Sequence, residues 1–114
     1  MRRLLTRPQF LAVAGARRKC AMPGLVLQAR RRPEGEAPAR EIRVGFTASR
    51  KVGNAVTRNR AKRRLRAAAA DILPAHAAPG FDLVLIARQG TVARDFASLE
   101  DDLSRGLDKL GAAR

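Results

Sequence analysis

The sequence predicts an α+β protein, a two-layer sandwich of helices on a small mixed β-sheet, with elements in the order α-β-β-α-β-α. Helix-like and strand-like periodicities alternate along 114 residues, a length that suits one domain. Residues 81–87 are almost wholly apolar and too short for an ordinary helix, which is typical of an inner strand buried on both faces. We therefore expect residues 1–114 to form a single domain.

The first expected element is a short helix over residues 6–16. Thr6 and Gln9 have the spacing of a capping box, and Pro8 suits the first helical turn. The segment is amphipathic and basic residues follow it at 17–19, which argues against a signal peptide. No apolar run reaches the roughly 18 residues of a membrane span. We expect a cytoplasmic protein that does not insert into a membrane.

Two strands are expected next, over residues 24–30 and 41–49. In the second, the even-numbered residues from Ile42 to Ala48 are apolar and should share one face of the sheet. Residues 31–40 between the strands are polar and rich in proline and glycine. We expect the two strands to pair as an antiparallel hairpin, with that loop as its surface connection.

The longest predicted helix begins at an Asn54 cap and runs to about Leu73, where Pro74 should stop it. An apolar stripe at spacings of five, four, three and four residues should face the sheet: Val56, Ala61, Leu65, Ala68 and Ile72. The inner strand at 81–87 follows a short loop. A last helix covers about 96–110, with Asp95 or Ser98 as its cap and leucines along one face.

Charge is the strongest functional signal in the sequence. The chain has 24 Lys and Arg against 10 Asp and Glu, a formal net charge of +14. The charge is uneven, with +16 over residues 1–66 and −2 over residues 67–114. Such an excess opposes compaction and favours a polyanionic partner. We expect the first part of the chain to meet that partner and the last part to act as scaffold.

Residues 50–66 concentrate this charge, with eight basic residues and no acidic one. On a helix, five of them form two neighbouring rows: Arg58, Lys62 and Arg66, then Arg60 and Arg64. Like charges at these spacings cost a few tenths of a kcal/mol per pair, which a phosphate backbone would remove. A face that is merely solvated would usually mix both signs, so the segment indicates nucleic-acid binding.

No group of residues indicates catalysis or metal binding by the protein itself. Cys20 is the single cysteine, so an internal disulfide and a cysteine-rich zinc site are excluded. His76 stands alone in a loop. Glu100, Asp101 and Asp102 are consecutive on a helix, where side chains diverge by about 100° each and cannot converge on one ion.

Two residues keep two interpretations each. Asn59 is either a surface polar residue or a group that orients a base or a metal-bound water. Phe10 either packs in the core or forms a cleft wall on which a base stacks, an interaction worth about 1–3 kcal/mol.

The segment RVGFTASRKVGNAVTRNRAKRRLRAA at 43–68 resembles the signature segment of the bacterial ribonuclease P protein family. The opening RLLTRPQFLAV and the strand FDLVLIARQG are also similar to that family. The resemblance implies an α-β sandwich with a left-handed βαβ crossover, against the general right-handed rule. It further implies a ribonucleoprotein endonuclease that removes the 5′ leader of precursor tRNA, in which a catalytic RNA carries out the hydrolysis with Mg²⁺. No obligate protein partner and no catalytic side chain are implied.

The resemblance also implies site residues. Those that bind RNA would be Arg50, Lys51, Asn54, Arg58, Asn59, Arg60, Lys62, Arg63 and Arg66. A cleft between the first helix and the sheet would take the single-stranded leader, lined by Phe10, Ala14, Gln28 and Phe46, although the strand pattern also fits Phe46 in the core. Many relatives carry aromatics where this chain has Ala14 and Gln28, so leader binding here should rely more on phosphate and polar contacts.

Two other classes share part of this pattern. A ribosomal or general RNA-chaperone protein would have the same charge and size, but little preference for precursor over mature tRNA. A DNA-binding regulator would place the basic helix in the major groove, usually as a dimer, and the sequence has no heptad seam.

Overall fold

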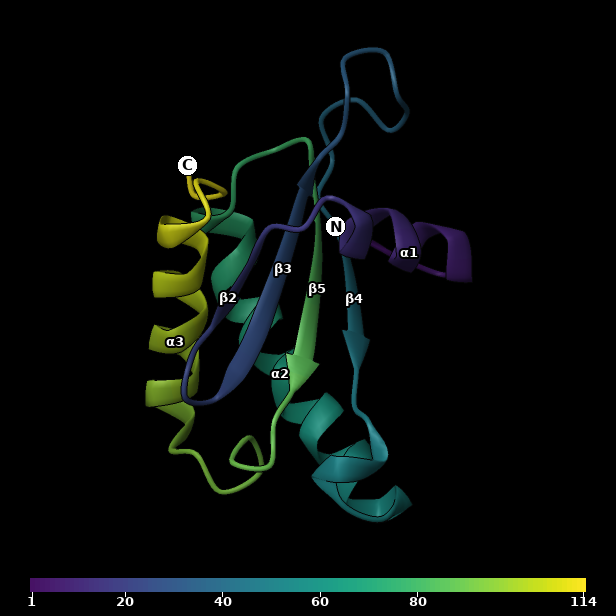
Figure 1. The fold of residues 1–114 in the computed structure, drawn as a ribbon. Coiled ribbons are helices and arrows are strands. Elements are labelled where there is room, and N and C mark those ends of the chain that lie inside the picture. The colour runs from purple at the N-terminus through teal and green to yellow at the C-terminus, as the bar shows by residue number, and fades with distance from the viewer.

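The computed structural model describes residues 1–114 as a five-stranded mixed sheet with helices on both faces (Figure 1). The strands are β1 (Arg2–Arg3), β2 (Lys19–Ala21), β3 (Leu25–Arg31), β4 (Arg43–Thr47) and β5 (Phe81–Ala87). The helices are α1 (Arg7–Gly15), a 3₁₀ turn η1 (Arg50–Val52), α2 (Ala55–His76) and α3 (Phe96–Lys109). Helices α2 and α3 cover one face of the sheet and α1 lies on the other (Figure 1). The α+β class is confirmed, and none of the helices combines the length and apolarity needed to cross a membrane.

The strand order is β1-β4-β5-β3-β2, with β5 at the centre. It pairs antiparallel with β3 and parallel with β4. The predicted hairpin between residues 24–30 and 41–49 is therefore wrong, because β5 lies between those two strands. The physical reason is burial: apart from Asp82, β5 is apolar along both faces and gains most from the central position, where both faces are covered.

The βαβ unit formed by β4, α2 and β5 has a left-handed crossover. In Figure 1 both strands point downward, α2 lies behind the sheet, and β4 is to the right of β5. Turned so that the strands point upward, β5 lies to the right of β4 with the helix behind, which is the left-handed arrangement. The expected exception to the right-handed rule is confirmed.

Helix α1 begins as the sequence predicts. Thr6 accepts a hydrogen bond from Gln9 N at 3.4 Å, and the Gln9 side chain accepts one from Thr6 N at 3.1 Å, completing the capping box. Val13 is fully buried against Leu4 and Val84, and this small apolar cluster holds α1 on the sheet.

The main core lies between the sheet and the pair α2 and α3. Its fully buried helical leucines and alanines include Ala61, Leu65, Ala68, Leu73, Leu99, Leu103 and Leu107. Val56, which we expected in this stripe, is instead 66% exposed. The reason is position, since the N-terminal end of α2 extends beyond the ends of the strands and has no sheet to cover (Figure 1).

The predicted stop of α2 at Pro74 is also wrong, because the helix continues to His76. A proline this close to the end removes one backbone hydrogen bond from the last turn and leaves the others. Ala77 N still donates to Leu73 O at 3.0 Å, and Arg114 N donates to His76 O at 2.8 Å. The C-terminal residues thus satisfy carbonyls that the helix end leaves open.

A buried ion network joins β3, β4 and β5. Asp82 of β5 accepts a hydrogen bond of 2.6 Å from Arg32, and Arg43 donates to both of its oxygens at 2.8 and 2.7 Å. Glu36, in the loop between β3 and β4, accepts two hydrogen bonds of 2.9 Å from Arg30. These bonds lower the pKa of Glu36. The Glu36 carboxylate therefore contributes fully to stability above the ordinary carboxyl pKa, and this contribution is lost as the pH falls through the lowered pKa of Glu36.

Candidate nucleic-acid interface

The N-terminal half of α2 carries a cluster of positive charge without partners inside the protein, hereafter the α2 basic face. Its members form no salt bridge and no side-chain hydrogen bond: Arg58, Arg60, Lys62, Arg63 and Arg66. The opposite side of the helix is anchored in the core by Ala61 and Leu65, both fully buried. The helix therefore presents uncompensated cations to the outside, an arrangement that suits a phosphate backbone.

The start of α2 adds polar groups to this face. Asn54 caps the helix by accepting a hydrogen bond of 2.9 Å from Thr57 N, as predicted. Arg50 and Lys51 lie just before it in η1. The positive end of the helix dipole lies at the same place, which favours an anion there. Asn59 is exposed between two arginines, so both of its interpretations stay open.

Arg64 differs from its neighbours on α2. Its guanidinium donates to Thr91 O at 2.5 Å and Val92 O at 2.7 Å, and it lies 5.8 Å from the centre of the Phe96 ring. These contacts tie α2 to the loop between β5 and α3. Arg64 is therefore occupied within the fold, although the sequence places it in a basic row beside Arg60.

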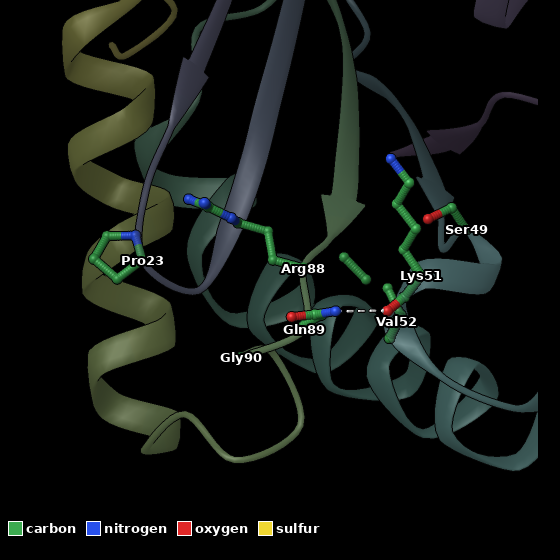
Figure 2. Close-up of a pocket in the computed structure, with 8 residues that line it drawn as sticks. Pro23, Ser49, Lys51, Val52, Arg88, Gln89 and Gly90 are labelled. Carbon is green, nitrogen blue, oxygen red and sulfur yellow. Dashed lines mark hydrogen bonds between the residues drawn. The ribbon is translucent and has the colours of Figure 1, made fainter.

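A polar cavity of about 520 Å³ opens at the carboxyl ends of the parallel strands β4 and β5. Figure 2 shows Lys51 and Arg88 on either side of the end of β5, with Gln89 between them and a hydrogen bond of 3.1 Å from Gln89 Nε2 to Lys51 O. The lining residues are Pro23, Ser49, Lys51, Val52, Ala87, Arg88, Gln89 and Gly90. The sequence indicated only Lys51 among them. A rule that could have found the others is that ligands of α/β sheets bind outside the carboxyl ends of the strands.

On the other face of the sheet, α1 borders a second basic hollow of about 290 Å³. Ala14 and Gln28, which we expected in one cleft, do line it together, along with Arg17, Arg18 and Lys19. The three basic residues were not predicted as part of this site. They follow α1 directly in the sequence, and their charge was the available signal.

Phe10 lies on the same face of the sheet, half-buried beside Leu4, Val13 and Val84. Its ring lies directly over Gly45 of β4, where a side chain as small as a methyl group would collide with it. The glycine thus permits the ring to lie against the sheet backbone.

Phe46 is not brought together with Phe10. It packs against the main core, on the face of the sheet that α2 covers, and the Arg3 guanidinium lies 5.3 Å from the centre of its ring. The alternation of β4 explains this placement, because Val44 and Phe46 share one face while Gly45 faces α1.

The three consecutive acids on α3 diverge as expected. Asp102 is buried and accepts hydrogen bonds from Gly24 N at 2.9 Å and Arg94 Nε at 3.0 Å. Asp101 pairs with Arg105 on the surface. A hydrogen bond with Asp71 of α2 raises the pKa of Glu100. The buried role of Asp102 was not predicted.

Comparison with known proteins gives one consistent match. A family model described as Ribonuclease P matches residues 1–111. The ribonuclease P protein component of Paramagnetospirillum magneticum is 51% identical over 110 residues, covering 96% of this chain and 83% of the relative. That of Ruegeria pomeroyi is 54% identical over 112 residues, covering 97% and 87%. Among solved structures, the RNase P protein of Staphylococcus aureus has a TM-score of 0.79 at 22% identity, covering 100% of this chain and 99% of that one, a likeness that bears on the fold.

Proposed function

The chain belongs to the ribonuclease P protein family, and we propose that, as the protein subunit of this endoribonuclease, it holds the catalytic RNA through α2 and the precursor tRNA leader through the face that carries α1. The observation that carries the proposal is the α2 basic face, whose cations have no partner within the fold. RNA phosphates supply the missing anions, and the bond cleaved is a phosphodiester at the 5′ end of the tRNA. In this proposal the whole chain acts as one domain in the cytoplasm.

The leader would cross the face of the sheet beside α1. Phe10 offers part of a ring there, and Ala14 and Gln28 border a hollow with three basic residues. This arrangement supports a site that combines one stacking contact with phosphate contacts. Phe46 packs against the main core on the other face of the sheet, so this proposal leaves it out of the leader site.

The protein would leave the chemistry to the RNA, which would hold the Mg²⁺ that the reaction needs. Three acids of this chain take part in ion pairs within the fold instead. Asp82 and Asp102 are buried and paired with arginines, and Asp101 pairs with Arg105. A carboxylate in such a pair already has its charge compensated and is a poor ligand for a hard cation.

Reconstitution tests the proposal directly. The protein alone should not cleave precursor tRNA, whereas addition to a bacterial ribonuclease P RNA transcript should raise 5′-leader removal at low Mg²⁺, because the cations of α2 offset RNA charge that Mg²⁺ would otherwise neutralise. Cleavage rates with and without protein, across a Mg²⁺ series, give the measurement. Cleavage by RNA-free protein that survives nuclease controls would contradict the proposal, as would equal binding of precursor and mature tRNA by the holoenzyme.

A second prediction concerns the α2 basic face. Arg60→Ala and Lys62→Ala should each weaken binding of the RNA subunit and lower the slope of log K against log salt by about 0.7–0.9, since each removes one phosphate contact. Lys109→Ala is the control, because Lys109 is an exposed cation at the far end of α3. If all three variants show the same slope as the parent protein, α2 carries only a solvated face.

A further inference from the structure

A small cavity lies between the β1 edge of the sheet and α2, on the face opposite α1. Its volume is about 190 Å³, below the roughly 300 Å³ of sites for drug-sized ligands, so it suits a single ring. Val44 and Ala69 form an apolar floor, and both are buried. Phe46, Arg3 and Arg66 line it from β4, β1 and α2, and Met1 and Arg2 complete the lining.

The lining has the chemistry of a nucleobase site. The Arg3 guanidinium lies over the Phe46 ring, 5.3 Å from its centre, in a cation–π contact. Neither Arg3 nor Arg66 has a salt-bridge partner, and no acidic residue lines the cavity. Unpaired RNA bases stack on aromatic rings and on guanidinium planes, while arginines beside them hold the flanking phosphates.

We propose that this cavity binds one unpaired nucleobase of the RNA subunit, stacked on Arg3 and Phe46, with its phosphate held by Arg66. The inference rests on the proposed function and adds a base-binding site to it. Two observations favour the RNA subunit over the precursor tRNA leader. Arg66 is the last member of the row formed with Arg58 and Lys62, so the cavity continues the α2 basic face. The sheet itself separates the cavity from the α1 side.

The test compares Phe46, which lines the cavity, with Phe96, which does not. Phe46→Leu should raise the Kd for an RNA subunit transcript by about 5- to 150-fold, the loss expected for one stacked base, and leave the salt slope unchanged. Phe96→Leu is the matched control, because Phe96 is also half-buried beneath an arginine but lies outside the cavity. Arg66→Met should instead lower the slope by about 0.7–0.9.

Arg3→Ala guards against a folding artefact, because it removes part of the stack without touching the core. It should weaken RNA-subunit binding while the melting temperature stays near that of the parent. Replacement of Phe46 by a photoreactive phenylalanine analogue should cross-link the holoenzyme at an unpaired nucleotide of the RNA subunit.

Equal Kd values for Phe46→Leu and Phe96→Leu, or a cross-link to the leader, would overturn the inference. Both outcomes can be told apart from failure of the proposed function. If only the base-binding inference is wrong, Arg60→Ala and Lys62→Ala will still weaken RNA binding, and the holoenzyme will still distinguish precursor from mature tRNA.

Discussion

Replacement of Asp82 by alanine should lower the free energy of unfolding by about 3–5 kcal/mol, the loss seen when one partner of a buried ion pair is removed. The Arg32 side chain is only 1% exposed, so without Asp82 its charge stays buried and uncompensated. Arg43 would lose both of its hydrogen bonds to the carboxylate as well. Because domains of this size are stable by about 5–15 kcal/mol, the melting temperature should fall by roughly 10 °C or more.

The matched control is Asp101→Ala, which breaks an aspartate–arginine pair of 3.2 Å on the surface. Both of its side chains are more than 60% exposed, so the change should cost at most about 1 kcal/mol. Arg32→Met added to Asp82→Ala should restore part of the loss, because it removes the stranded charge. Thermal unfolding is best followed in chloride, since sulfate could occupy the freed arginines. Similar losses of unfolding free energy for Asp82→Ala and Asp101→Ala would show that the buried network stabilises the fold no more than a surface pair does.

Asp82 also shows where sequence reasoning reaches its limit in the fold. The pattern of residues 81–87 predicted an inner strand, and β5 is one. The same pattern gave no reason for a carboxylate within it, because its partners, Arg32 just after β3 and Arg43 in β4, are brought near only by the folded sheet. The prediction of strand order failed for the same reason, since that order depends on which strand gains most from burial at the centre of the sheet.

The short edge strands were missed for a different reason. β1 has two residues and β2 has three, too few for any periodicity to register. Both exist through pairing with longer neighbours, β4 and β3. Helix ends with local signals were predicted better, as the Thr6 capping box and the Asn54 and Asp95 caps show.

For the candidate site, the charge run predicted a helix with a basic outer face, and α2 has one. What the run could not tell is which cations the fold itself occupies. Arg64 donates hydrogen bonds to carbonyls of a loop 27 and 28 residues further along the chain. Arg60, predicted in the same row of the helix, has no such partner. Arg88 and Gln89 join Lys51 only because β4 and β5 end side by side.

Replacement of Phe10 by alanine should weaken binding of leader-bearing precursor tRNA to the holoenzyme by about 1–3 kcal/mol and leave mature tRNA unaffected, if a leader base stacks on the exposed part of the ring. The ring is half-buried, so some loss of stability should accompany the change, below the roughly 3–5 kcal/mol of a fully buried phenylalanine. Few other rings are available to compensate, because Ala14 and Gln28 occupy the neighbouring positions. Affinities for both tRNAs should be measured well below the melting temperature of the variant.

Val13→Ala separates stacking from packing on the same helix. Val13 is fully buried in the cluster that holds α1 on the sheet, so its truncation should destabilise the protein without reaching a ligand. Phe10→Ala and Val13→Ala should therefore both lower the melting temperature, but only Phe10→Ala should reduce the preference for precursor over mature tRNA. If the two variants lose stability alike and keep the same preference, Phe10 serves only to dock α1 on Gly45. Leader binding on this face would then depend on Arg17, Lys19 and the polar groups around Gln28.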